Sequence, residues 1–200
     1  MSPVFPQSHQ SQSTMAASQI PIWLPLFRDS FSDLEISKPR FNYRETLEQM
    51  ENLPELLGGT ILDKQMASCC IGAFWLKADF FDEAHRLFQE IHTPTGSLWH
   101  GISHRREGDH ANASYWFSRC RNHPATKAIR SIETDNTGLN LAGTENANGP
   151  WDYDIFNRLV ENRIKDGGNL AELRNLEENE WRQTILWTLQ KALGKKPMIS

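Results

Sequence analysis

The spacing of hydrophobic residues along the chain predicts a protein built from helices. From residue 44 onwards, apolar side chains recur at intervals of three and four, until Pro54 and the pair Gly58–Gly59 end this first pattern. The same periodicity between residues 63 and 124 predicts four helices, with turns near Asp79, at 94–96 and at 108–109. No stretch shows the apolar and polar alternation of a half-buried strand. The expected fold class is therefore all-α.

Two further helices are expected near the C-terminal end, within residues 152–193. Residues 152–166 place their apolar side chains on one stripe, and Gly167–Gly168 follows as a pair that ends a helix. A last helix is expected to begin at Asn169, with Glu172 three residues on in a capping-box arrangement. Both helices offer an apolar face on which the preceding helices can pack.

Two segments lack this periodicity. Residues 1–19 are mostly Ser, Gln, Pro and Ala, a composition that predicts a disordered leader. Residues 122–150 carry Asn, Thr and Gly over a length unusual for a connector, which predicts a mobile loop or lid. Because 200 residues suffice for one compact domain, residues 20–197 are expected to form a single helical domain.

The central helices contain an internal duplication with a period of 29 residues. A shift of 29 aligns small and aromatic residues that pack the two helices of a hairpin, namely Gly72 with Gly101, Ala84 with Ala113 and Phe88 with Phe117. The pattern resembles tetratricopeptide (TPR) repeats and implies hairpin repeats at 63–92 and 97–121, although the usual period is ~34 and no third copy follows. We therefore expect two TPR-like helical hairpins packed against two C-terminal helices.

A second resemblance rests on the segment His104–Asp109, which reads HRREGD, and on the residues that follow it. Asn112–Ala113 and Tyr115–Trp116–Phe117 complete an HRREGDxxNAxYWF segment. This segment, together with Trp151–Asp152 and Glu180–Trp181, is similar to an uncharacterised family of small proteins found in bacteria and fungi. The likeness covers roughly residues 65 to 190. This resemblance implies a fold but no particular chemical activity.

Composition narrows the classes of partner. Charged residues make up 23% of the chain and give a formal charge of −4, without the basic excess of proteins that bind nucleic acid. The longest apolar run, residues 20–27, contains two prolines and is shorter than the ~20 residues of a membrane span. The cysteines Cys69, Cys70 and Cys120 form no disulfide or metal pattern and are expected to be reduced, buried thiols. A cytoplasmic protein with no membrane or nucleic-acid partner is the expectation.

Histidines are concentrated in the middle of the chain, where six of the seven lie between residues 85 and 123. On the helix expected over 97–107, a spacing of four and three places His100, His104 and Glu107 on one face. Their counterparts 29 residues earlier are apolar: Ile71, Trp75 and Ala78. The second hairpin is thus expected to bury ionisable groups where the first buries hydrocarbon. Buried polar groups need partners, water, a metal or a ligand, so this stripe is the candidate site.

A metal is one interpretation of the stripe. Two histidines four residues apart on a helix can bind one Zn or Fe ion. Glu107 lies ~10 Å along the helix axis from His100, so a third ligand is expected from Glu83 or His85 on the neighbouring helix. Two other interpretations stay open: a metal-free polar pocket, and histidines that are only hydrogen-bonded within the core.

The stripe and its surroundings supply three groups of candidate residues. The candidate catalytic residues are His104, as acid or base, with His100 and Glu107. The candidate ligands of a divalent metal are His100, His104 and His85. The candidate ligand-binding residues are the aromatic and charged side chains around them, Trp99, Arg105, Arg106, Asp109, Tyr115 and Trp116.

Two functions from different classes follow. The first is a protein that binds a small molecule in a buried His/Glu pocket and could be a metal-assisted enzyme of small-molecule metabolism. The alternative is a non-catalytic interaction module that holds a partner peptide or helix in the groove of its TPR-like hairpins. An enzyme should gather the polar stripe in one place, whereas an interaction module should spread it over an open surface.

Overall fold

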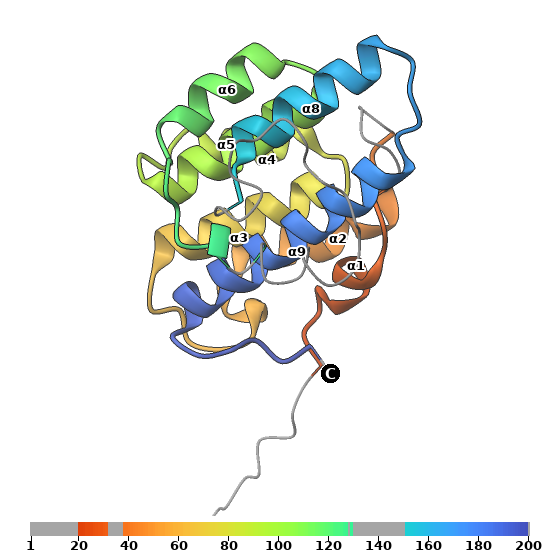
Figure 1. The fold of residues 1–200 in the computed structure, drawn as a ribbon. Coiled ribbons are helices and arrows are strands. Elements are labelled where there is room, and N and C mark those ends of the chain that lie inside the picture. Colours follow the sequence, from red (N-terminus) through yellow and green to blue (C-terminus); the bar gives the residue numbers. More distant parts are fainter. Residues whose placement is uncertain (1–19, 32–37, 128, 130–150, 200) are drawn as a thin grey trace, which may run out of the picture.

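The computed structural model describes residues 20–31, 38–127, 129 and 151–199 (Figure 1). Every regular element within these ranges is a helix, which confirms the all-α prediction. Two of them are 3₁₀ helices, η1 (Phe41–Tyr43) and η2 (Pro54–Leu57). The α-helices are α1 (Leu24–Arg28), α2 (Arg44–Asn52), α3 (Lys64–Lys77), α4 (Phe81–Phe88), α5 (Pro94–Arg106), α6 (His110–Ser118), α8 (Tyr153–Lys165) and α9 (Ala171–Leu193).

The four central helices form the two expected helix pairs, α3 with α4 and α5 with α6. Each pair turns through one residue with a left-handed backbone, Asp79 with φ 64° and Gly108 with φ 77°. Glycine adopts this conformation without strain, and aspartate is among the few other residues that tolerate it. The two residues are themselves 29 positions apart, so the turns repeat with the period of the sequence.

Both hairpins close through the same contact between a glycine and a phenylalanine. A Cβ atom on Gly72 would lie 2.5 Å from the ring of Phe88, and one on Gly101 would lie 2.6 Å from the ring of Phe117. No side chain fits in that space, so only glycine allows the two helices of each hairpin to approach this closely. The duplication is therefore present in the packing, while assignment to the TPR class itself stays a prediction.

Two helix starts differ from the sequence prediction. Helix α5 begins at Pro94 rather than 97, because Thr93 caps it by accepting from Gly96 N at 3.1 Å and proline suits the first turn. Helix α9 begins at Ala171, and its N-cap residue Leu170 makes no side-chain capping bond. The expected capping box is wrong, since Asn169 Oδ1 instead accepts from Ala171 N two residues on.

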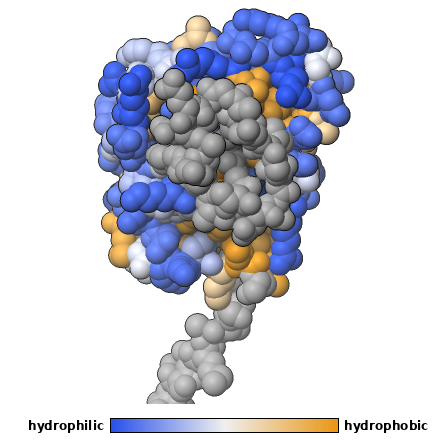
Figure 2. All heavy atoms as spheres, in the orientation of Figure 1, coloured by the Kyte–Doolittle hydropathy of each residue, from blue (hydrophilic) through white to orange (hydrophobic). Residues whose placement is uncertain are grey.

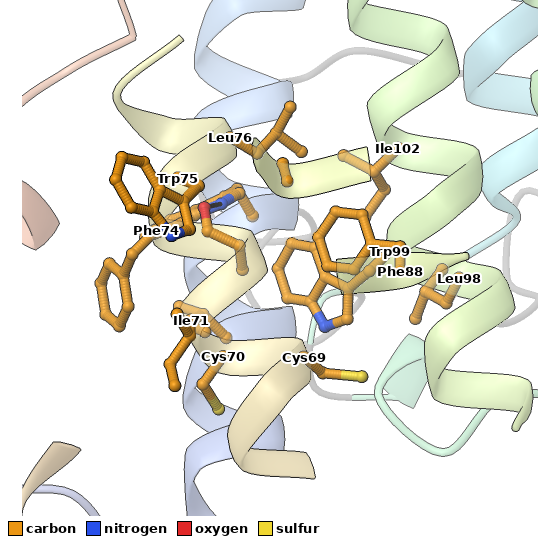
Figure 3. Packing of buried hydrophobic residues seen from close by; sticks show 14 of the residues in the cluster. Cys69, Cys70, Ile71, Phe74, Trp75, Leu76, Phe88, Leu98, Trp99 and Ile102 are labelled. Carbon is orange, nitrogen blue, oxygen red and sulfur yellow. Dashed lines mark hydrogen bonds between the residues drawn. The ribbon is translucent and has the colours of Figure 1, made fainter. Parts of the chain in front are cut away.

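The C-terminal helices pack on the two hairpins as expected. Helix α9 runs along α3, and α8 packs against α6 (Figure 1). Figure 3 shows where side chains of α3, α4 and α5 meet, and there the rings of Phe88 and Trp99 stack at 6.3 Å. Trp181 of α9 extends this core toward Phe74, at 5.7 Å. On the face that Figure 2 shows, many of the described residues are hydrophilic, and the apolar residues of the helices form the buried core.

Two sequence predictions concern segments outside the described residues. The expected leader, residues 1–19, lies wholly outside them, as do residues 128 and 130–150 of the expected loop. The described start of that loop holds His123, whose Nε2 lies 3.0 Å from Thr95 Oγ1 in the core. Among the helices that the structure describes, none combines the length and the apolarity that crossing a bilayer requires.

Candidate metal centre

Three histidines from two helices converge at one point of the fold. His85 lies on α4, and His100 and His104 lie on α5. One ring nitrogen from each histidine lies within 4.8 Å of those of the other two. The sequence predicted the pair on α5 and left Glu83 or His85 as the third member. The structure brings His85 to the pair, whereas Glu83 bonds to Arg44 at 2.7 Å.

The helical spacing and the packing of α4 on α5 explain this convergence. A separation of four residues stacks the rings of His100 and His104, with centroids 4.8 Å apart and planes 16° apart. The ring of His85 stands nearly perpendicular to both, with centroids 4.5 Å from His100 and 5.0 Å from His104. The polar stripe is therefore gathered in one place rather than spread over a surface.

The pair on α5 is buried, as the duplication predicts. His100 is 3% exposed and His104 is 6% exposed, and the counterparts Ile71 and Trp75 on α3 are buried too. The side chain of His85 is 34% exposed and reaches solvent at the edge of the cluster. A small ion or molecule would reach the two buried rings by way of His85.

His100 carries an unusual combination of burial and missing hydrogen bonds. Its Nε2 lies 3.0 Å from His85 Nε2, while its Nδ1 is buried without a hydrogen-bond partner. Burial, and then the neighbouring His85 and His104, lower the pKa of His100 to about 3. The ring is therefore neutral at physiological pH and keeps a lone pair available for a ligand.

Glu107 lies behind two of the three rings. Its Oε2 is 3.1 Å from His104 Nδ1, although the two atoms are not aligned for a hydrogen bond, and its Oε1 is 4.0 Å from His85 Nδ1. A carboxylate in this position favours the proton on Nδ1 and leaves Nε2 of the same ring with a lone pair. Glu107 is thus placed to orient the rings of His104 and His85 rather than to bind the metal itself. This agrees with the ~10 Å expected between Glu107 and His100 along the helix axis.

The separations of the nitrogen atoms suit a transition-metal ion. Zn–N bonds of ~2.0–2.1 Å place two ligands of a tetrahedral ion about 3.3 Å apart. The facing nitrogens of His85 and His100 are already 3.0 Å apart, and all three ligand atoms lie within 4.8 Å. Small rotations of the rings bring such a set to metal-binding distances, since His85 at the edge is only partly buried.

The aromatic residues predicted to bind a ligand lie at different depths around the cluster. Trp116 of α6 stacks on His100, with centroids 4.0 Å apart and planes 16° apart. Tyr115 is 54% exposed and meets Trp116 edge-on at 5.4 Å. Asp109 is the N-cap of α6 and accepts from Asn112 N at 3.1 Å. Trp116 thus contacts an imidazole ring of the cluster, whereas Asp109 meets His104 through the backbone, its N–H donating to His104 O at 2.9 Å.

The other predicted ligand-binding residues of α5 face the C-terminal helix. Arg105 makes a buried ion pair with Glu180, and Arg106 pairs with Glu177 at 3.2 Å and with Asp79 at 2.7 Å. Burial raises the pKa of Glu177, and the two arginines oppose that shift. The structure therefore places these arginines in an ion-pair network apart from the histidines, and their role toward a ligand stays a prediction.

Trp99 also lies on the side of α5 that faces α9. Its indole N–H donates to Thr188 Oγ1 of α9 at 3.3 Å, inside the core. Sequence reasoning missed the partners that α9 supplies to α5. A signal was available, because Glu177 and Glu180 lie three residues apart beside the apolar positions of a core helix.

Comparison of the chain with protein-family models, with curated proteins and with solved structures finds no match. The packing of α3 with α4 and of α5 with α6 agrees with the predicted hairpins. A conclusion about function therefore depends on the residues of the site.

Proposed function

We propose that this protein binds a divalent transition-metal ion through His85, His100 and His104. The observation that carries the proposal is the convergence of three imidazole rings whose ligand atoms lie within 4.8 Å of one another. Imidazole is a preferred donor for Zn, Fe, Ni and Cu ions, and three imidazoles on two packed helices form a rigid ligand set.

The arrangement of protons in the cluster supports a metal over histidines that only stabilise the core. Without a cation, the 3.0 Å contact between His85 and His100 requires a proton on one of the two facing nitrogens. That contact still leaves His100 Nδ1 buried and without a partner. An unsatisfied buried polar atom costs about 1–3 kcal/mol, so the cluster is a poor choice for stability alone. A metal ion bound between the two Nε2 atoms would take the place of that proton, so that the lone pairs of both nitrogens point at a cation.

The ligand set also indicates what the metal would do. Three neutral histidines leave at least one coordination position for water or a small molecule, which is the pattern of catalytic rather than structural zinc sites. A metal-bound water has a pKa lowered to ~7 and supplies hydroxide at neutral pH. In this proposal, a small molecule reaches the metal past the partly exposed His85. The reaction is a metal-assisted hydrolysis or hydration of that molecule.

Isothermal titration calorimetry with Zn²⁺ tests the binding step. We expect one Zn²⁺ per wild-type chain and a loss of binding of about 100-fold or more when His100 or His104 is replaced by alanine. His92→Ala is the matched control, because His92 is an exposed histidine outside the cluster, and it should bind as the wild type does. Wild-type protein that does not bind Zn²⁺, or binding that survives both cluster substitutions, would contradict the proposal.

Hydrolysis of p-nitrophenyl acetate tests the catalytic step separately. Zinc-loaded wild-type protein should hydrolyse the ester faster than the chelated protein, and His104→Ala should remove the difference. A rate that is the same with and without zinc, in protein shown to hold the metal, would leave a metal-binding protein without this chemistry.

A further inference from the structure

Asn112 is a further polar side chain at the histidine cluster, contributed by α6. Its Nδ2 atom lies 3.2 Å from His104 Nε2, the ring nitrogen that does not face Glu107. This is the nitrogen that would bind a metal under the proposed function, on which the present inference rests. Asn112 therefore occupies space next to the proposed ion rather than behind a ligand.

The backbone of Asn112 is held in place while its amide is free to turn. Asn112 N donates to the N-cap Asp109 at 3.1 Å, so the residue is fixed in the first turn of α6. Within the part of the chain that the structure describes, the side chain makes no hydrogen bond besides the one to His104. Rotation of the amide by half a turn exchanges Oδ1 and Nδ2 and breaks that single contact.

The rotated amide would meet the geometry of a coordination sphere. It would place Oδ1 about 3.2 Å from His104 Nε2, where Nδ2 now lies. Two ligands of one tetrahedral metal ion are separated by about 3.3 Å. The facing nitrogens of His85 and His100 are 3.0 Å apart, so both contacts have the spacing of neighbouring ligands.

From this geometry we infer that Asn112 stands at the fourth coordination position of the metal and is a displaceable ligand there. A neutral amide oxygen is a weaker donor to a zinc-like ion than a carboxylate or hydroxide oxygen. An incoming molecule with an anionic oxygen would displace it, and the released amide would then donate a hydrogen bond to that oxygen. The ligand class is therefore a small molecule that binds the metal through a carboxylate or similar oxyanion.

Cobalt titrations of three variants test this inference. Asn112→Asp keeps the shape of the side chain and supplies an anionic oxygen, so Co²⁺ should bind at least about tenfold more tightly than to the wild type. Asn112→Ala should still bind Co²⁺, with a position permanently open. Ala111→Asp is the matched control, since it adds the same charge at an exposed neighbouring position of α6 and should leave the affinity unchanged.

Azide, a small anion, reports on the open position through the visible spectrum of bound Co²⁺. We expect azide to change the spectrum of the wild type, to do so at lower concentration in Asn112→Ala, and to have no effect in Asn112→Asp. Thermal melts of each metal-free variant check that the fold is kept.

Three outcomes would overturn the inference. Equal gains in Asn112→Asp and Ala111→Asp would show a general effect of charge, and no gain in Asn112→Asp would place the side chain outside the coordination sphere. An azide response unaltered by either change at Asn112 would do the same. Wild-type protein that binds no Co²⁺ or Zn²⁺ would instead remove the proposed function itself, so the two failures are distinguishable.

Discussion

The two central hairpins share one backbone design and differ in what they bury. Both use a glycine against a phenylalanine and a left-handed residue at the turn, 29 positions apart. The first hairpin fills its inner face with Ile71 and Trp75, and the second places His100 and His104 at the same positions. The scaffold therefore does not need ionisable groups there, because one copy folds with hydrocarbon.

The polar atoms of the two hairpins are also satisfied differently. In the first hairpin, at the position that matches His104, the indole nitrogen of Trp75 donates to Glu51 of α2 at 3.1 Å. On α5 of the second, His100 and His104 meet His85 of α4, and the Nδ1 atoms of His100 and His104 are buried and make no hydrogen bond. The first arrangement is that of a core, whereas the second has a surplus of donors and acceptors that suits a bound ion.

Replacing Trp75, the counterpart of His104 in the first hairpin, by alanine should have the largest effect on stability. Trp75→Ala removes a fully buried ring that also packs on Phe80 and should lower the free energy of unfolding by about 3–5 kcal/mol. The counterpart His104→Ala in metal-free protein should cost less, about 1–3 kcal/mol, because its partners are incompletely bonded. Urea denaturation measures both. A larger loss for His104→Ala would show that the histidines are the structural core of their hairpin.

Zinc should stabilise the protein, because the proposed site joins α4 of the first hairpin to α5 of the second. At a free Zn²⁺ concentration 100 times the Kd, binding to the folded chain alone adds about 2.7 kcal/mol. Excess chelator should return the melting temperature to that of metal-free protein, and His100→Ala should show no zinc effect. Equal stabilisation of wild type and His100→Ala would place the bound zinc elsewhere on the chain.

Acid should weaken the metal-free protein through two buried histidines. Burial lowers the pKa of His123 to about 4, and burial with the neighbouring rings lowers the pKa of His100 to about 3. Below pH ~6.5 the unfolded chain takes up protons that the folded chain does not, so stability falls with pH. Each histidine should account for about 2 kcal/mol between pH 7 and pH 5.

His123 separates this effect from the metal site. It lies outside the cluster, where Ala125 N donates to its Nδ1 at 3.3 Å. Unfolding of His123→Asn at pH 7 and pH 5 should show a smaller loss than the wild type, by about 2 kcal/mol. An unchanged loss would mean that His123 titrates equally in the folded and unfolded chains.

Making the second hairpin resemble the first should have the smallest effect on the free energy of unfolding. This change should raise the stability, whereas the others lower it or depend on zinc. His100→Ile installs the residue found at the duplicate position and removes the unpartnered nitrogen. We expect the metal-free variant to be more stable than the wild type by about 1 kcal/mol, and to bind zinc far more weakly. A clear loss of metal-free stability would show that His100 is kept for folding.

Much of the fold was predictable because it depends on local rules. The helical periodicity and the repeat of Gly72 and Phe88 as Gly101 and Phe117 predicted the helix pairs. The start of α5 was predicted too late, since Pro94 was taken as part of a turn although proline is favoured in a first helical turn.

The candidate site was predictable only in part. The spacing of His100 and His104 on one helix predicted a buried pair, because the duplication showed which face points inward. Which residue of α4 joins them depends on how two helices pack, and periodicity alone did not separate His85 from Glu83. Asn112 was missed for the same reason, since it reaches His104 across the contact between α5 and α6.

X-ray absorption at the zinc edge, on wild-type protein loaded with one equivalent of Zn²⁺, tests the central claim most directly. The three-histidine centre predicts Zn–N distances of ~2.0–2.1 Å with the multiple scattering of about three imidazole rings. His104→Ala should lose one of these rings or the metal. A first shell of oxygen alone, or one with sulfur at ~2.3 Å from the cysteines, would contradict a metal centre at His85, His100 and His104.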